Sequence, residues 1–412
     1  MPPIPRSSRK CARPIPASER QVSVMTDLRT IRVDQIGSLS SPLKLQKVFG
    51  RYKQGAASEA ELERAKDAAI RDIVRRQAAI GLPVVTDGEL RRRNFQESFG
   101  SSVSGFEVAA EDRAMEGVST APLARTEQNF SAPGPAIVTR RKVVEPLRLA
   151  RNVPLAEYQF TAALTDRPVK ATVLSPDRIS QRFDWQSSKA IYRDMDAFMA
   201  DVIEITRSII RGLIEAGCRY IQIDAPGYTA YVDQVSLDRM RSRGEDPKRN
   251  LERSIAADNA VIAGFDGVAF GIHLCKGNAR TIDPQTGKVT PQWHREGHYD
   301  GIAEPVFSQL KHHRILLEYD DERSGSFAPL AHVRNGAVAV LGLVTTKRPD
   351  LEPFDLLQRR IDEASRYLPI AQLALSPQCG FGGLDHLVIP EEDQWRKFER
   401  IIAVADAVWG RA

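Results

Sequence analysis

The stretch LIEAGCRYIQIDAP, residues 213–226, carries the pattern that decides the fold. An amphipathic helical pattern over residues 193–216 ends at Gly217, and a glycine just past the last helical residue is a common helix stop. The run at 219–224 that follows is rich in aromatic and β-branched residues, which is typical of a short strand. The stretch therefore predicts a helix that leads into a strand ending in Asp224.

The same pattern recurs along the chain, because eight β-rich runs alternate with amphipathic helices, as in parallel sheets with helical crossovers. The runs lie at residues 32–38, 83–87, 169–174, 219–224, 268–274, 314–318, 337–344 and 371–376. This number favours a closed (β/α)8 TIM barrel, although periodicity alone does not exclude an open doubly wound sheet. The sequence thus predicts an α/β fold, with one catalytic barrel over residues 26–412.

Two connections are too long to be simple loops. The first, residues 99–166, contains the alternating segment AIVTRRKVV at 136–144, which predicts a β-hairpin inserted between strands 2 and 3 over the barrel mouth. The second, residues 276–300, is rich in Gly, Pro, His and Asp. It predicts a lid or a substrate-gripping loop, with a solvated excursion as the alternative.

The net charge of +5 is concentrated at the start of the chain, where residues 1–25 hold five basic residues and one acidic residue. This proline-rich tail is predicted to be disordered. The remaining body is nearly neutral, which argues against a nucleic-acid or membrane surface as partner. No run is long enough to span a membrane, and four cysteines are too few for a disulfide framework. The sequence predicts a soluble cytoplasmic protein.

Candidate metal ligands fall at the ends of three predicted strands. His273 and Cys275 are two residues apart, so both side chains project to one face, although such a pair alone is more often a packed strand end. Glu318 ends the sixth run and Cys379 follows the eighth, and all strand ends of a barrel open on one face. One imidazole, two thiolates and one carboxylate suit tetrahedral zinc (Zn2+). In the alternative, Glu318 pairs with an arginine such as Arg323, and Cys379 is an inert buried thiol.

Zinc bound by these ligands favours chemistry on sulfur. The thiolate is the competent nucleophile, and a free thiol with a pKa of about 8.5 is mostly protonated at neutral pH. Coordination to zinc deprotonates the thiol. Two cysteinate ligands leave the zinc electron-rich and a poor activator of water. Alkyl transfer to a substrate thiol therefore fits better than hydrolysis.

Further polar residues at strand ends are candidate contacts to the substrate. Ile36, Gly37 and Ser38 end the first run with exposed backbone and a hydroxyl group, which suits a carboxylate. Glu89 and Asp224 follow the second and fourth runs and together suit an ammonium group. Taken singly, each of these segments is more often ordinary turn chemistry.

In their order, these motifs resemble the C-terminal catalytic barrel of the cobalamin-independent methionine synthase family over residues 30–410. The matching segments are Ile36-Gly37-Ser38, Thr86-Asp87-Gly88-Glu89, Ile221-Gln222-Ile223-Asp224, His273-x-Cys275, Leu317-Glu318 and Ser376-Pro377-Gln378-Cys379-Gly380. The resemblance implies a methyl transfer to homocysteine. It also implies four zinc ligands and three contacts to the amino-acid part of homocysteine, namely His273, Cys275, Glu318 and Cys379, and Ser38, Glu89 and Asp224.

The chain also departs from that family. Full-length synthases carry a further N-terminal barrel, and Ala225 replaces a glutamate of the family after the fourth strand. Arg182 aligns with the tryptophan that stacks on folate and is kept as a substrate contact, and Lys347 aligns with the histidine that donates a proton. The thiol half of the site thus matches, whereas the folate half does not. Methyltetrahydrofolate, a methylated corrinoid and another small methyl compound all stay open as the donor.

Three hypotheses follow from the sequence. The preferred one is a zinc-dependent S-methyltransferase acting on homocysteine or a similar small thiol. The second is a zinc-dependent epoxide opening of the epoxyalkane–coenzyme M transferase type, against which Glu89 and Asp224 argue because they suit an amino-acid thiol. The third is a non-catalytic zinc-binding protein, such as a corrinoid- or metal-handling partner. The oligomeric state is left open, with a homo-oligomer among the options.

Overall fold

A parallel β-sheet forms the centre of the computed structural model, which describes residues 27–92, 95–107, 141–277, 279–282, 289–293, 295–383, 386–387 and 389–410. Its six strands follow the order β10-β9-β8-β5-β4-β3, and every neighbouring pair is parallel. In chain order they are β3 (Lys170–Leu174), β4 (Tyr220–Asp224), β5 (Ala269–Leu274), β8 (Arg314–Glu318), β9 (Val338–Val344) and β10 (Leu373–Pro377). These strands confirm the α/β fold and fall within a residue or two of six predicted runs.

The first two predicted strands are present only as extended segments at the two edges of this sheet. Val33 forms a single parallel bridge with Leu375 of β10, and Val85 forms one with Val169 next to β3. The two segments also meet each other, since the Leu39 amide donates to the Gly88 carbonyl over 3.0 Å. The eight segments therefore follow one another in a ring, but no eight-stranded closed ladder forms among the residues that the structure describes.

Side-chain amides explain why no ladder forms between the first two segments. Gln35 Nε2 donates to the Val84 carbonyl over 2.8 Å, and Gln77 of helix α2 bonds both the amide and the carbonyl of Thr86. Buried backbone groups need a partner, and here side chains supply it in place of the neighbouring strand. The expectation of two regular strands at 32–38 and 83–87 was therefore wrong in detail.

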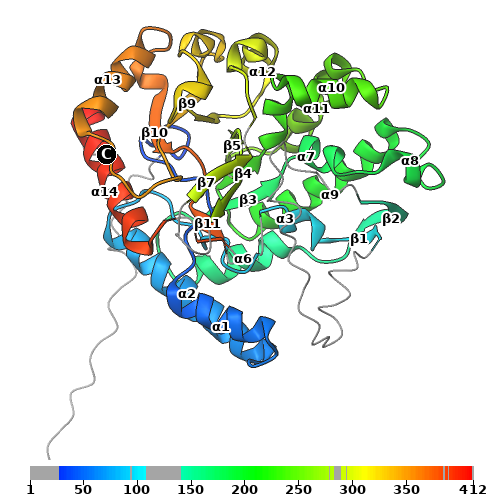
Figure 1. The fold of residues 1–412 in the computed structure, drawn as a ribbon, viewed down its shortest axis with the longest axis horizontal. Coiled ribbons are helices and arrows are strands. Elements are labelled where there is room, and N and C mark those ends of the chain that lie inside the picture. The colour runs from blue at the N-terminus through cyan, green and yellow to red at the C-terminus, as the bar shows by residue number, and fades with distance from the viewer. Residues whose placement is uncertain are drawn as a thin grey trace, which may run out of the picture.

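Amphipathic helices surround the strands (Figure 1). In the longest after β3, α9, the buried residues Phe198, Val202, Ile205 and Ile209 recur at helical spacing. No helix of the described residues is long and apolar enough to cross a membrane. The α-helices are α1 (Leu43–Lys53), α2 (Glu59–Ala79), α3 (Glu97–Gly100), α6 (Val153–Ala162), α7 (Pro176–Gln181), α8 (Trp185–Ser188), α9 (Met195–Glu215), α10 (Gln234–Ser242), α11 (Pro247–Ile262), α12 (Ala303–Gln309), α13 (Phe354–Ser365) and α14 (Glu391–Trp409).

Small antiparallel ribbons interrupt the βα repeat. The first pairs β1 (Val103–Phe106) with β2 (Val143–Leu149) between the second and third segments of the ring. The last two residues of the predicted hairpin segment 136–144 are the first two residues of β2. Residues 136–140 of that segment lie outside the described residues, and so does the tail at 1–25. A second ribbon, β6 (Ala279–Ile282) with β7 (Val289–Trp293), lies within the connection at 276–300 that was expected to be a loop. The two-residue strands β11 (Gly382–Gly383) and β12 (His386–Leu387) form a third.

A cluster of buried charges lies within the sheet, which we call the interior cluster: Asp34, Lys170, Tyr220 and Arg314. Asp34 Oδ1 accepts from Lys170 Nζ over 2.9 Å, and Asp34 Oδ2 accepts from Tyr220 over 2.6 Å and from Arg314 Nε over 2.9 Å. Burial alone would raise the pKa of Asp34, but the charges of Lys170 and Arg314 lower it. The cluster is thus held by an ionised carboxylate with both oxygens occupied.

Candidate metal centre

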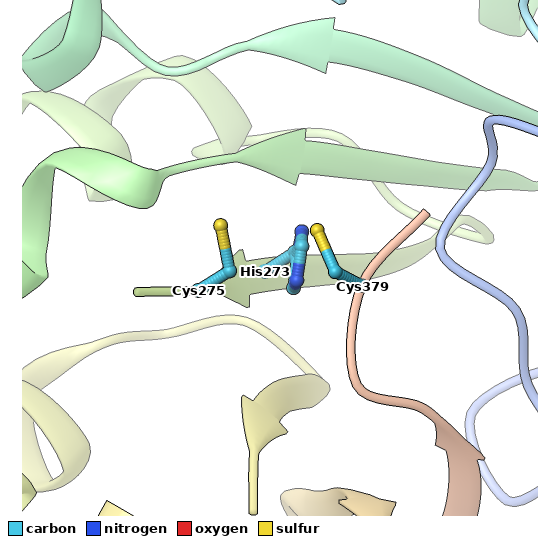
Figure 2. Close-up of side chains that lie close together, drawn as sticks. All are labelled: His273, Cys275 and Cys379. Atoms are coloured by element: carbon cyan, nitrogen blue, oxygen red, sulfur yellow. The ribbon is translucent and has the colours of Figure 1, made fainter. Parts of the chain in front are cut away.

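Three of the four predicted metal ligands meet at the carboxyl edge of the parallel sheet. His273 belongs to β5, Cys275 follows the end of that strand, and Cys379 follows the end of β10. One ligand atom from each lies within 4.8 Å of the others, and Figure 2 shows the three side chains converging. We call these residues the donor cluster. Parallel strands end at the same edge, which explains how residues more than a hundred positions apart in the sequence come together.

His273 presents a buried nitrogen atom toward the two cysteines. The residue is 4% exposed, and its Nε2 makes no hydrogen bond among the described residues. Its Nδ1 lies 3.8 Å from Asp224 Oδ1. A buried polar atom without a partner costs free energy and calls for an explanation. A metal ion bound at Nε2, with Nδ1 facing a carboxylate, is a common arrangement for a histidine ligand.

The two thiols of the donor cluster share a hydrogen bond. The thiol of Cys379 donates to Cys275, and this bond, together with the charge of His273, lowers the pKa of Cys275 to about 6 against the effect of burial. The same bond raises the pKa of Cys379. Two cysteine sulfur atoms, which zinc binds as thiolates, and one imidazole nitrogen are the donor types that zinc prefers. The residues of this cluster therefore fit a zinc ion.

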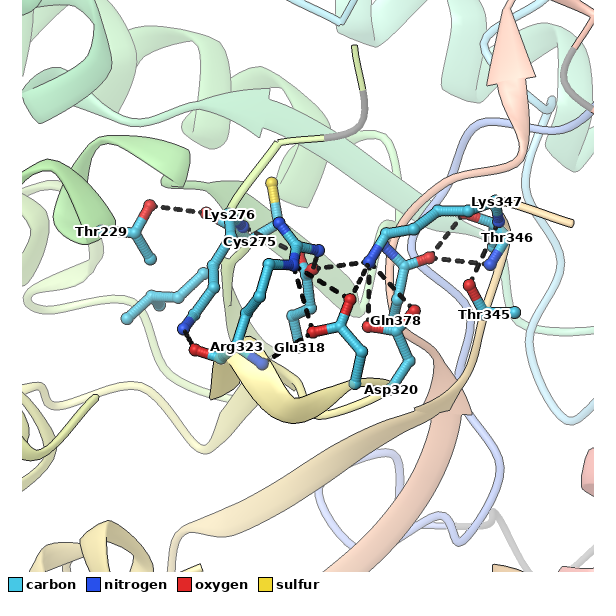
Figure 3. A network of polar contacts seen from close by, with 12 residues as sticks. Thr229, Cys275, Lys276, Glu318, Asp320, Arg323, Thr345, Thr346, Lys347 and Gln378 are labelled. Atoms are coloured by element: carbon cyan, nitrogen blue, oxygen red, sulfur yellow. Dashed lines mark hydrogen bonds and ion pairs between the residues drawn. The ribbon is translucent and has the colours of Figure 1, made fainter. Parts of the chain in front are cut away.

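Glu318 lies beside the donor cluster but is held by other partners. Its carboxylate is fully buried, Oε1 accepts from Arg323 Nη2 over 2.8 Å and from Lys347 Nζ over 3.1 Å, and Oε2 accepts from the Lys276 amide over 2.8 Å (Figure 3). Its charge acts on the pKa of Cys275, so the carboxylate is close to the thiols. The structure thus brings three predicted ligands together and places the fourth next to them, paired with Arg323.

Lys347 belongs to this carboxylate network. Besides Glu318, its Nζ contacts Asp320 Oδ2 over 3.0 Å and Asp321 Oδ2 over 3.1 Å. Burial opposes the charge of Lys347, but the carboxylates raise its pKa. The ammonium group therefore keeps its proton in this arrangement. Asp320 and Asp321 were not singled out from the sequence, although only Tyr319 separates them from Glu318.

Glu89 and Asp224, the predicted ammonium contacts, are both 5% exposed and lie near each other. Glu89 Oε1 accepts from Thr172 Oγ1 over 2.7 Å and from Arg92 Nη1 over 3.3 Å. Burial, with the nearby charge of Asp224, raises the pKa of Glu89 to about 7. Its φ of 55° lies in the region that favours glycine, and such strained backbone is often found at functional sites. Two neighbouring carboxylates of this kind suit an ammonium group.

The first strand-like segment lies against the loop that carries Cys379. The Phe381 amide donates to the Ser38 carbonyl over 2.9 Å. A Cβ atom on Gly380 would collide with Ser38 Oγ, and one on Gly37 would lie 2.8 Å from a methyl group of Thr172. These two glycines allow the close approach. Ile36 is buried, and its carbonyl accepts from Gln222 Nε2 over 2.6 Å, so all three predicted residues 36–38 lie at this edge.

Arg182 lies farther along, at the end of α7. Its side chain is half-buried and bonds Gln96, and its carbonyl accepts from the Arg141 amide over 2.7 Å. No contact joins Arg182 to the donor cluster among the described residues. Its role as a substrate contact stays a prediction, and it would apply to a part of the site away from the two cysteines.

The chain matches one family model and known relatives over most of its length. Residues 32–282 match the catalytic domain of cobalamin-independent synthase. The uncharacterized protein YxjH of Bacillus subtilis is 31% identical over 92% of this chain and 94% of the relative. The methionine synthase of Pyrococcus abyssi is 23% identical over 88% of this chain and 89% of the relative. A Listeria monocytogenes structure assigned as a vitamin-B12-independent methionine synthase aligns with a TM-score of 0.69 at 23% identity, covering 92% of this chain and 98% of that one.

The fold, the donor cluster and these matches define a methyltransferase of the methionine-synthase type. The chain belongs to the cobalamin-independent methionine synthase catalytic-domain family. This confirms the resemblance stated from the motifs. The structural match below 25% identity supports the α/β fold with its parallel sheet and no finer feature.

Proposed function

We propose that the protein is a zinc-dependent S-methyltransferase that transfers a methyl group to the thiolate of homocysteine or a similar small thiol. The observation that carries this proposal is the donor cluster, in which a buried His273 Nε2, without a hydrogen bond among the described residues, lies beside the Cys275 and Cys379 sulfur atoms. Family membership supports the methyl transfer. The donor set supports the zinc.

His273, Cys275 and Cys379 would hold the zinc. Glu318 would be the fourth ligand, and to bind the metal it would give up its ion pair with Arg323 or with Lys347. When bound, zinc supplies the acidity that converts a substrate thiol into a thiolate at neutral pH. In the transfer, a sulfur–carbon bond forms while the bond between the methyl group and its donor breaks, and the proton of the thiol is released.

The other residues of the site bind and orient the thiol. We propose that Glu89 and Asp224 bind its ammonium group and that the backbone of Gly37 and Ser38 receives its carboxylate, as expected from the sequence. Asp224 also faces His273 Nδ1, which favours the tautomer with Nε2 free for a metal. The role of Lys347 as proton donor stays a prediction, because its ammonium group lies against three carboxylates.

The test combines metal analysis with a donor screen. Purified protein should contain about one zinc per chain, and homocysteine should yield methionine with one of methyltetrahydrofolate, a methylated corrinoid or another small methyl compound. A parallel arm supplies coenzyme M and an epoxide. Turnover in that arm alone, or full activity in protein free of zinc, would overturn the proposal.

A further inference from the structure

A buried arginine near the donor cluster forms no ion pair within the part of the chain that the structure describes. Arg178 follows β3 in the first turn of α7, is 8% exposed, and its Nε makes no hydrogen bond among the described residues. Its one bond runs from Nη1 to Gln181 Oε1 over a long 3.4 Å. A buried guanidinium group is normally paired with a carboxylate or a phosphate, so this arrangement costs free energy in the protein alone.

Two further arginines, Arg295 and Arg182, lie close enough to Arg178 for their charges to act on it. Arg295 is 4% exposed and bonds the Pro226 carbonyl and, over 3.1 Å, Thr229 Oγ1. Thr229 in turn donates to the Cys275 carbonyl over 2.7 Å (Figure 3), which joins Arg295 to the donor cluster. Burial, then the charges of Arg295 and Arg182, lower the pKa of Arg178 to about 9. Burial and the neighbouring positive charges thus both disfavour the charged form of Arg178.

The charge of the neighbouring carboxylate, Asp177, favours the charged form of Arg178 and raises its pKa, but the two groups are not bonded to each other. Asp177 forms no ion pair with Arg178 among the described residues, and its oxygens accept from Ser254 over 2.6 Å, from Tyr231 over 3.0 Å and from Gln181 over 3.2 Å. Burial raises the pKa of Asp177. The carboxyl group is thus engaged by hydroxyl and amide donors, and the guanidinium charge of Arg178 is left for another anion.

We propose that Arg178, with Arg295 beside it, forms an oxyanion-binding subsite next to the donor cluster and that it takes the anionic group of the methyl donor. This inference rests on the proposed function. A guanidinium group presents parallel N–H donors that match the two oxygens of a carboxylate, sulfonate or phosphate. The assignment to the donor follows from position, because Arg178 lies in α7 and Arg182 directly follows that helix, whereas the proposed thiol contacts Glu89 and Asp224 lie on other elements.

The test measures binding of inorganic sulfate, a probe with the same oxyanion chemistry, by calorimetry and by the shift in melting temperature at constant ionic strength. The zinc-loaded protein should bind sulfate saturably. Arg178→Met should weaken sulfate binding at least tenfold. Arg178→Lys should have an intermediate affinity, since lysine keeps the positive charge but lacks the two parallel N–H donors of the guanidinium group. Arg64→Met removes an equal charge from an exposed position of α2 and should bind sulfate as the unaltered protein does.

A second readout separates binding from a structural role. Replacement of a buried, unpaired charge by methionine should leave the melting temperature without sulfate unchanged or raised. A lowered melting temperature with sulfate affinity retained would show a structural arginine and overturn the subsite. If Arg178→Met does not fold, Arg178→Lys carries the comparison.

Homocysteine identifies the source of the anion. Its affinity should be equal in Arg178→Met and the unaltered protein; a parallel loss would assign the subsite to the thiol's own carboxylate and overturn the assignment to the donor. The two proposals fail in different ways. Absence of homocysteine binding by the unaltered protein would overturn the proposed function, whereas sulfate affinity unchanged by Arg178→Met would overturn the subsite alone.

Discussion

The interior cluster and the donor cluster are both buried and polar, but they differ in whether the group at their centre is satisfied by its neighbours. In the interior cluster, both oxygens of Asp34 are occupied by Lys170, Tyr220 and Arg314, and only the outlying Arg314 Nη2 makes no hydrogen bond among the described residues. In the donor cluster, His273 Nε2 makes no hydrogen bond to any residue that the structure describes, and two sulfur atoms share one hydrogen bond. Burial of polar groups alone does not separate structure from function. The difference lies in whether the groups satisfy one another, because a satisfied network stabilises the fold and an unsatisfied one can bind a ligand.

A single side chain joins the two regions. Gln222 of β4 accepts from Lys170 Nζ over 2.7 Å, and its Nε2 donates to Asp224 Oδ1 over 2.7 Å. Asp224 then faces His273 Nδ1. A chain of contacts therefore runs from the interior cluster to a proposed metal ligand. Substitutions along this chain should show which residues determine the free energy of unfolding and which determine zinc affinity.

Loss of a donor-cluster thiol should have the largest effect. Cys275→Ser or Cys379→Ser should lose the zinc and abolish methyl transfer, while the protein stays folded because these residues follow strand ends. Zinc content by mass spectrometry, circular dichroism and methionine formation measure the three quantities. Cys218→Ala is the matched control, since Cys218 is a buried thiol outside the donor cluster whose pKa burial raises to about 12. Full zinc occupancy in either serine variant would contradict the assignment.

Lys170→Met should show the opposite pattern. Removal of one partner of a buried ion pair leaves Asp34 undercompensated, and such changes typically cost about 3–5 kcal/mol in the free energy of unfolding. Zinc bound per folded molecule should be retained. Denaturant unfolding measures the first and metal analysis of the folded fraction the second. Arg241→Met, which breaks an exposed pair with Asp238, should leave stability unchanged within error. A small loss for Lys170→Met would show that the interior cluster is not structural.

The sequence predicted the six regular strands because each is a short run bounded by turn residues. It failed at 32–38 and 83–87, where Gln35 and Gln77 take over the backbone hydrogen bonds, and no local pattern reveals which side chain will do so. The same limit explains the ribbon β6–β7, since antiparallel pairing within a long polar connection depends on contacts that periodicity does not encode.

For the site, strand-end placement was enough to bring His273, Cys275 and Cys379 together, because the edge is set by the topology. The partners of Glu318 were harder to predict. Arg323, five residues later, was raised as an alternative partner, but Lys347 comes from after β9 and required the three-dimensional structure. Arg178 was missed for a similar reason, as an arginine in a turn is ordinary until its burial and lack of an ion pair are known.

Glu89→Gln should weaken binding of the thiol substrate about tenfold, as expected for loss of one charged partner of an ammonium group, with zinc retained. The pH dependence has a definite sign. With a pKa of about 7, Glu89 is protonated as the pH falls, so affinity should decrease about tenfold from pH 8 to pH 6. Norvaline, a thiol-free analogue of homocysteine, isolates this ammonium contact in calorimetry. A flat profile in the unaltered protein, or an unchanged affinity in Glu89→Gln, would remove Glu89 from the site.

Gln222→Met should have the smallest effect and should affect both regions at once. It removes the acceptor of Lys170 and the donor to Asp224, so the free energy of unfolding should fall by about 1–3 kcal/mol. Zinc affinity should fall only by roughly threefold, less than for a direct partner of a metal ligand, because Gln222 acts on His273 through Asp224. Competition with a zinc chelator measures the affinity and denaturant unfolding the stability. Loss of stability with zinc affinity unchanged would show that Asp224 holds its position without help from the interior cluster, and the two regions would then be independent.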